Sequence, residues 1–202
     1  MKLNRDSKKY ESIPKPMGLV NIPSKDFKLL DRDIKLAYAS GIEDFNLQIT
    51  AQTLVALYKA RKSLERDEQL IIKSAYRPPK LQAELWRRRV EDIKNSFPSL
   101  DEQEIISLAS LYTASPEHPK FPPHMRGDAL DVSLSRKDII LEMYLEPFSY
   151  DQMQFDYFEN KNKEIHENRL YLRRVMQAAG FFPYDKEFWH FGLTPVWPEE
   201  RT

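Results

Sequence analysis

The irregular order of helix-like and strand-like segments is the feature that most constrains the fold of this 202-residue chain. Helical spacing of apolar residues, or a capping sequence, marks helices at residues 50–66, 80–95, 99–112 and 163–179. Short apolar runs mark strands at residues 70–76, 129–134 and 188–193. Because these segments do not alternate as in repeated βαβ units, we expect an α+β fold with a mainly antiparallel central sheet flanked by helices.

Local signals fix several boundaries of these segments. Thr50 is a candidate N-cap for the first helix, and Ser99 with Glu102 matches a capping box for the third. Gly180 lies where a C′ glycine would end the last helix. Residues 1–27 carry charges and prolines but few periodic apolar residues. We therefore expect an extended N-terminal arm on a single domain that spans residues 1–202.

Composition excludes several classes of protein. Hydrophobic residues make up 41% of the chain, enough to bury a core, so wholesale disorder is not expected. There is no cysteine, which excludes disulfides, thiolate metal ligands and a cysteine nucleophile. The 31 basic and 31 acidic residues balance, so charge gives no reason to expect nucleic acid or a membrane as a partner. The sequence leaves the oligomeric state open.

The N-terminal residues indicate the cellular compartment in which we expect the protein. They are charged and lack the apolar region of a signal peptide, and no stretch approaches the roughly 18 apolar residues of a membrane span. We expect a soluble cytoplasmic protein, or a periplasmic one if a signal peptide has been removed.

Two of the four histidines, His124 and His190, have acidic neighbours in the sequence. Together with Asp131 they would give a catalytic zinc ion three protein ligands and leave one position for water. Glu187 could then move protons as a non-ligand base. His124 and Asp131 are seven residues apart, and Glu187 and His190 are three apart, so neither pair converges on a straight strand. Each interval needs a bend, which Gly127 can supply in the first and a bulge near residues 188–189 in the second.

Spacing alone leaves a plainer interpretation open. His124 could be an ordinary loop histidine, Asp131 a turn or pairing residue, and His190 a packed neighbour of Trp189. His-x6-Asp and Glu-x-x-His both occur often by chance.

Several motifs in order give a more specific signal. Residues 124–131 resemble the His-x-x-Gly-x-Ala-x-Asp signature of the zinc D-alanyl-D-alanine peptidases. Residues 187–190 resemble the Glu-x-Trp-His segment of that family, and residues 74–78 resemble its Tyr-Arg-Pro strand end. The resemblance covers about residues 70–193 and is strongest to the D-Ala-D-Ala dipeptidases, which include vancomycin-resistance enzymes.

The resemblance implies a role for each matching residue. His124, Asp131 and His190 would hold one zinc ion per chain at one face of the sheet. Glu187 would act as general base and then general acid, and Arg77 would stabilise the oxyanion of the tetrahedral intermediate. The implied reaction is zinc-dependent hydrolysis of D-Ala-D-Ala, or a related small D-amino-acid dipeptide, by metal-activated water. The expected partner is a small peptide substrate.

Departures from the family pattern keep two alternatives open. Met125 stands where a serine is common, and the stretch at residues 142–149 lacks the family's glycine and has Ser149 in place of an acid. These positions shape the substrate pocket, so a D,D-carboxypeptidase or endopeptidase on longer peptidoglycan stem peptides is the first alternative. The second is a non-catalytic, metal-stabilised binding module, against which the presence of both Glu187 and Arg77 argues.

Overall fold

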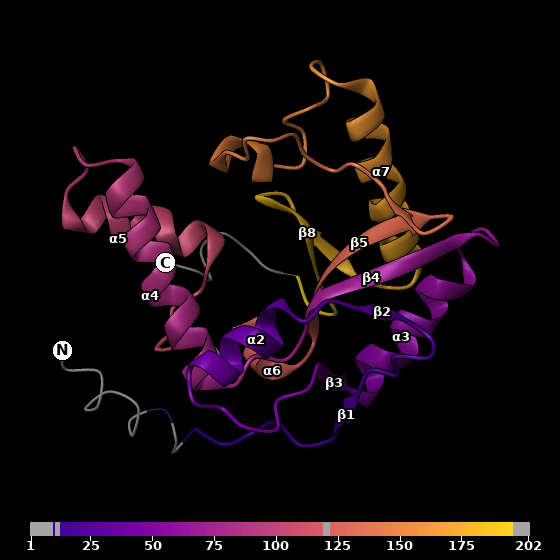
Figure 1. Cartoon of the computed structure of the whole chain (residues 1–202), viewed down its shortest axis with the longest axis horizontal. Helices are drawn as coiled ribbons and strands as arrows, with labels where there is room; N and C mark the ends of the chain where they lie inside the picture. The colour runs from indigo at the N-terminus through magenta and orange to yellow at the C-terminus, as the bar shows by residue number, and fades with distance from the viewer. Residues whose placement is uncertain (1–9, 11–12, 119–121, 196–202) are drawn as a thin grey trace.

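The computed structural model describes residues 10, 13–118 and 122–195. Its elements, in chain order (Figure 1), are β1 Leu19–Asn21, β2 Lys28–Leu29, α2 Arg32–Ala39, β3 Gln48–Thr50, α3 Ala51–Lys62, β4 Glu68–Ser74, α4 Pro79–Ser96, α5 Glu102–Tyr112, α6 Pro123–Arg126, β5 Ala129–Arg136, β6 Ile139–Ile140, the 3-10 helix η1 Tyr150–Met153, α7 Lys163–Ala178, β7 Phe182–Tyr184 and β8 Glu187–Gly192. Among the described helices, none has the length and apolar character needed to cross a membrane.

The central sheet has the strand order β2-β4-β5-β8-β7, with β6 added beside β5. The β4–β5, β5–β8 and β7–β8 pairs are antiparallel, but β2 pairs with β4 in parallel. The sheet is therefore mixed, and the prediction of a mainly antiparallel sheet was wrong in this respect. The connection from β2 to β4 passes through α2 and α3, and such a crossover allows parallel pairing. With two residues, β2 carries no recognisable strand pattern.

The main core lies between one face of this sheet and the helices α3 and α7, which lie together on that side (Figure 1). Leu130, Val132 and Leu134 of β5 point into this core. Asp131 alternates with them and therefore faces the opposite side of the sheet. On that opposite side α4 and α5 pack on each other around a smaller apolar cluster (Figure 1). Residues of the sheet, of α4 and of α5 line a common cavity.

The predicted helix caps at Thr50 and Gly180 were confirmed, and the predicted capping box at Ser99 was placed two residues too early. The Thr50 side chain accepts a hydrogen bond from the Thr53 amide, and Gly180 adopts a left-handed conformation with φ 98° after α7. The third helix does have a capping box, but its residues are Asp101 and Glu104, two positions beyond the predicted pair. Asp101 is the N-cap because its carboxylate accepts a hydrogen bond from the Glu104 amide at 2.8 Å. In return, the Glu104 carboxylate accepts a hydrogen bond from the Asp101 amide at 2.8 Å.

The N-terminal arm joins the domain through β1. This strand pairs antiparallel with β3, with Leu19 opposite Thr50. Residues 1–9 and 11–12 of the predicted arm lie outside the described residues. The described part of the arm is therefore packed along the domain through strand pairing.

A charged cluster stabilises the end of β4 away from α4. The Glu68 carboxylate accepts hydrogen bonds from Arg136 at 2.8 Å, from the Glu65 amide at 3.1 Å and from the Tyr171 hydroxyl. Burial alone would raise the pKa of Glu68, but these donors together outweigh it and lower the pKa below 4.5. The folded protein therefore favours the ionised carboxylate.

Replacing Glu68 with glutamine should lower the free energy of unfolding at pH 7 by about 1–2 kcal/mol. Because the folded pKa lies below the ordinary value of 4.5, this stabilisation is present above pH 4.5 and is lost as the pH falls through the folded pKa. Urea denaturation of both proteins across pH 7 to 3 measures it. A difference that stays constant down to pH 3 would contradict the account.

Candidate active site

The structure brings His124, Asp131 and His190 together from three elements. Asp131 on β5 and His190 on β8 are direct cross-strand partners, and His124 comes from the short helix α6. Three side-chain atoms form a nearly equilateral triangle. His124 Nε2 is 3.2 Å from Asp131 Oδ1 and 3.2 Å from His190 Nδ1, and the last two atoms are 3.1 Å apart. All three residues are buried.

The predicted bend between His124 and Asp131 is present at Gly127. His124 lies in the short helix α6, and Gly127 ends this helix with φ 74°. A β-carbon at Gly127 would lie 2.5 Å from Leu19 Cδ2, so the arm strand β1 packs directly against the corner. The Gly127 carbonyl accepts a hydrogen bond from the Thr50 amide at 2.9 Å. These contacts hold the turn that aims His124 back toward Asp131.

The second predicted bend lies within β8. Pro183 of β7 pairs with Phe191, whereas the next residue, Tyr184, pairs with Glu187. Residues 188–190 therefore fall between two successive pairs, which is the bulge that the Glu187–His190 spacing requires. Both predicted bends are confirmed.

The chemistry of the three donors suits a cation. His124 Nδ1 lies 2.7 Å from the Ala75 carbonyl oxygen and must donate to it, so Nε2 of the neutral ring presents a lone pair. Zinc bound tetrahedrally at about 2.0–2.1 Å places its ligand atoms about 3.3 Å apart, close to the sides of this triangle. Burial alone would raise the pKa of Asp131, but His124 and Arg77 lower it well below the usual range. The triangle thus presents an ionised oxygen and two imidazole nitrogens.

Arg77 lies directly behind the carboxylate of this triangle, just after β4. Its Nη2 donates to Asp131 Oδ2 at 2.7 Å, and its Nε donates to Ser74 Oγ at 2.9 Å. Asp33 of α2 completes the set, because its Oδ2 accepts a hydrogen bond from Ser74 Oγ at 2.5 Å and lies 3.4 Å from Arg77 Nε. The Arg77 side chain is only 14% exposed, so the guanidinium is held in one orientation.

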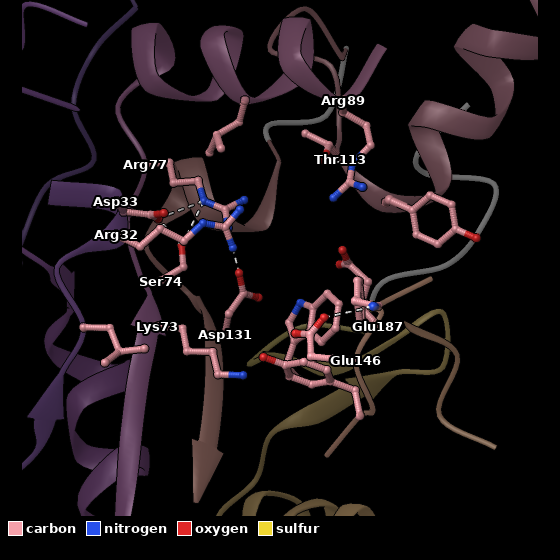
Figure 2. A pocket seen from close by; sticks show the side chains of 16 residues that line it. Arg32, Asp33, Lys73, Ser74, Arg77, Arg89, Thr113, Asp131, Glu146 and Glu187 are labelled. Carbon is pink, nitrogen blue, oxygen red and sulfur yellow. Dashed lines mark hydrogen bonds and ion pairs between the residues drawn. The ribbon is translucent and has the colours of Figure 1, made fainter. Parts of the chain in front are cut away.

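A cavity of about 430 Å³ opens beside these groups. Arg77 and Asp131 lie on one wall, and Glu187, the first residue of β8, lies across from them (Figure 2). The Glu187 residue is 6% exposed and is not part of the donor triangle. The cavity thus combines a candidate metal site, a separate carboxylate and a fixed guanidinium.

Comparison with known proteins identifies the family of this chain. The sequence model of a peptidase family described as D-ala-D-ala dipeptidase matches residues 46–196. The chain belongs to this family. A D-alanyl-D-alanine dipeptidase of Escherichia coli (strain K12) is 28% identical over 173 residues, covering 81% of this chain and 79% of the relative. A D-alanyl-D-alanine dipeptidase of Enterococcus faecium is 30% identical over 105 residues, covering 48% of this chain and 46% of the relative.

Two solved structures also match. VanYB in complex with D-Alanine-D-Alanine is 18% identical, with a TM-score of 0.48, over 73% of this chain and 72% of that one. A mutant of the vancomycin-resistance D,D-pentapeptidase VanY in complex with Zn(II) is 16% identical, with a TM-score of 0.47, over 75% of this chain and 76% of that one.

The structure adds cavity residues that the sequence did not indicate. Asp33 was not predicted as a site residue, because helix α2 was not predicted and no motif marks this position. The residue is only 2% exposed. Lys73 lies where the β4–β5 register shifts, and its ammonium group is 5.9 Å from the centre of the Phe188 ring. Burial lowers the pKa of Lys73 to about 8. Arg89 of α4 also lines the cavity.

Proposed function

We propose that this member of the D-Ala-D-Ala dipeptidase family hydrolyses D-Ala-D-Ala, or a closely related small D-amino-acid dipeptide, in a zinc-dependent reaction. The observation that carries the proposal is the triangle of donor atoms with sides of 3.1–3.2 Å beside a cavity that also holds Glu187. We further propose that residues 1–202 form one peptidase domain, with residues 1–27 as its N-terminal arm.

His124 Nε2, Asp131 Oδ1 and His190 Nδ1 would hold one zinc ion at the face of the sheet opposite the main core. When bound, zinc supplies a Lewis acid at the scissile carbonyl and makes a water molecule acidic enough to attack near neutral pH. Three protein ligands leave the coordination position that such catalysis requires. The hydrogen bond from His124 Nδ1 to the Ala75 carbonyl fixes the ring in the orientation that this role needs.

Glu187 accepts the proton of the attacking water and then delivers it to the nitrogen of the leaving D-alanine as the C–N bond breaks. Arg77 donates a hydrogen bond to the oxygen that becomes negatively charged in the tetrahedral intermediate. Its Nη2 and Nε are occupied by Asp131 and Ser74, which leaves Nη1 for this oxygen. A donor fixed in advance stabilises such charge more than a mobile one does. Asp33 is a positioning residue in this scheme.

The first alternative is cleavage of longer peptidoglycan stem peptides. One observation favours it: Tyr144 and Phe148 line the cavity yet are 39% and 42% exposed, and they could contact a substrate that extends outward. The size of the cavity, about 430 Å³, favours a small ligand. A non-catalytic binding module would need neither Glu187 nor Arg77 beside its metal.

Zinc titration of metal-free protein tests the proposal. D-alanine release from D-Ala-D-Ala should rise in proportion to added zinc and reach its maximum at one zinc per chain, because one donor triangle is present among the described residues. Magnesium should not replace zinc, because two imidazole ligands disfavour it. Protein that holds one zinc but releases no D-alanine would contradict the dipeptidase assignment, and stem peptides should then be assayed.

A further inference from the structure

The cations that line the cavity are not equivalent. Arg77 is committed to Asp131 and Asp33. Lys73 is half-buried against aromatic rings, where desolvation lowers its pKa to about 8. Arg32 is exposed at the start of α2. Arg89 is half-buried, and no carboxylate in the described part of the chain lies within ion-pair distance of it.

Arg89 is nevertheless held in place. Its guanidinium lies 5.7 Å from the centre of the Tyr112 ring and 5.3 Å from that of Tyr150. Its Nε donates a hydrogen bond to Thr113 Oγ1 at 3.4 Å, and its terminal nitrogens have no hydrogen-bond partner among the described residues. Figure 2 shows Arg89 reaching from α4 into the cavity, across from Arg77 and Asp131. Aromatic faces stabilise a cation without neutralising it, so the full charge remains available to a ligand.

We propose that Arg89 binds the free α-carboxylate of the substrate and thereby limits the enzyme to peptides with a free C-terminus. This inference rests on the proposed peptidase function and identifies its specificity. A dipeptide carboxylate that enters a cavity containing Asp131 and Glu187 needs a cation to offset desolvation and like-charge repulsion. The planar guanidinium of Arg89 can take both carboxylate oxygens at once.

The assignment has a consequence for substrate class. Dipeptides and longer peptides that end in a free residue can both reach Arg89 with a carboxylate. An internal peptide bond offers an uncharged amide at the same place, so endopeptidase activity is disfavoured.

The test compares D-Ala-D-Ala with its C-terminal amide, each assayed with the zinc-loaded wild type and Arg89→Met. Wild type should prefer the free acid by about 10- to 100-fold in kcat/KM, and Arg89→Met should lose this preference chiefly through a higher KM for the acid. Because a packing defect would slow both substrates alike, the acid-to-amide ratio isolates the carboxylate contact. Arg89→Lys should keep part of the preference.

Arg88→Met is the matched control. Arg88 is adjacent on α4, pairs with Glu84 at the surface and does not line the cavity. Its acid-to-amide ratio should equal that of the wild type. An unchanged ratio in Arg89→Met would overturn the assignment.

A binding measurement separates this inference from the reaction itself. Calorimetry with the same two ligands, in Glu187→Gln protein with and without Arg89→Met, reports carboxylate recognition when turnover is blocked. If the wild type releases no D-alanine but binding still favours the free acid over the amide through Arg89, the proposed reaction is wrong and the carboxylate-binding role of Arg89 stands. If D-alanine is released while the acid and the amide bind equally, the assignment fails alone. Absence of both release and binding overturns both.

Discussion

Glu187→Gln protein should bind zinc as the wild type does but release D-alanine about 10²- to 10⁴-fold more slowly. Glutamine preserves the shape of the side chain and cannot accept a proton. The loss should appear in kcat, because the role proposed for Glu187 is proton transfer at the water and the leaving group, and Glu187 does not belong to the donor triangle. Steady-state assays and metal analysis of the purified variant measure the two quantities together.

Asp185→Asn is the control for this experiment. Asp185 lies two residues before Glu187, its side chain is 78% exposed, and it pairs with Arg173 at the surface. Its kcat should stay within about twofold of wild type, since a surface ion pair contributes little. If zinc-loaded Glu187→Gln keeps more than about a tenth of wild-type kcat, another group moves the proton, because general-base catalysis contributes at least about 10²-fold.

Arg169→Met should destabilise the protein by about 3–5 kcal/mol. Arg169 of α7 is fully buried, and its guanidinium donates five hydrogen bonds to backbone carbonyls of the segment between Met143 and Phe155. It also stacks 3.8 Å from the centre of the Phe188 ring, next to Glu187. Burial lowers the pKa of Arg169 to about 9, so the hydrogen bonds must outweigh a substantial desolvation penalty. Methionine would leave those carbonyls buried without donors.

Urea denaturation measures this loss, and Arg173→Met is the control. Arg173 lies on the same helix, also stacks on an aromatic ring, but pairs with an exposed aspartate. We expect it to lose no more than about 1 kcal/mol. The segment that Arg169 holds supplies Tyr144, Glu146 and Phe148 to the cavity, so folded Arg169→Met should also show a raised KM. A loss equal to that of the control would contradict the role of Arg169.

The candidate site was predictable where its residues lie in contiguous motifs. Residues 124–131 and 187–190 each carry their own bend, so the sequence indicated both the donors and the corners that aim them. The ligand roles themselves stay a prediction until zinc is titrated. Asp33 lies 44 residues before Arg77, and only the β4–α2 packing brings them together, so no local pattern could reveal the pair.

The same reasoning explains the errors in the fold. Helices with strong apolar spacing were predicted to within a few residues of their observed ends, because the spacing of apolar residues along the local sequence reflects which face is buried. β2 is two residues long and pairs only through a crossover, so its parallel orientation depends on the whole chain between residues 28 and 74. No sequence pattern marks Arg89, because its stacking on Tyr112 and Tyr150 is a tertiary contact.

The contact of Leu19 with Gly127, and that of Asp33 with Arg77, set a lower limit on the length of a working enzyme. The match to the family model begins at residue 46, after both Leu19 and Asp33. A fragment cut at that boundary would keep every candidate zinc ligand and Glu187. It would lose the strand that braces the corner before Asp131 and the carboxylate that orients Arg77. The part of the chain that the family model covers is thus smaller than the part that the proposed mechanism needs.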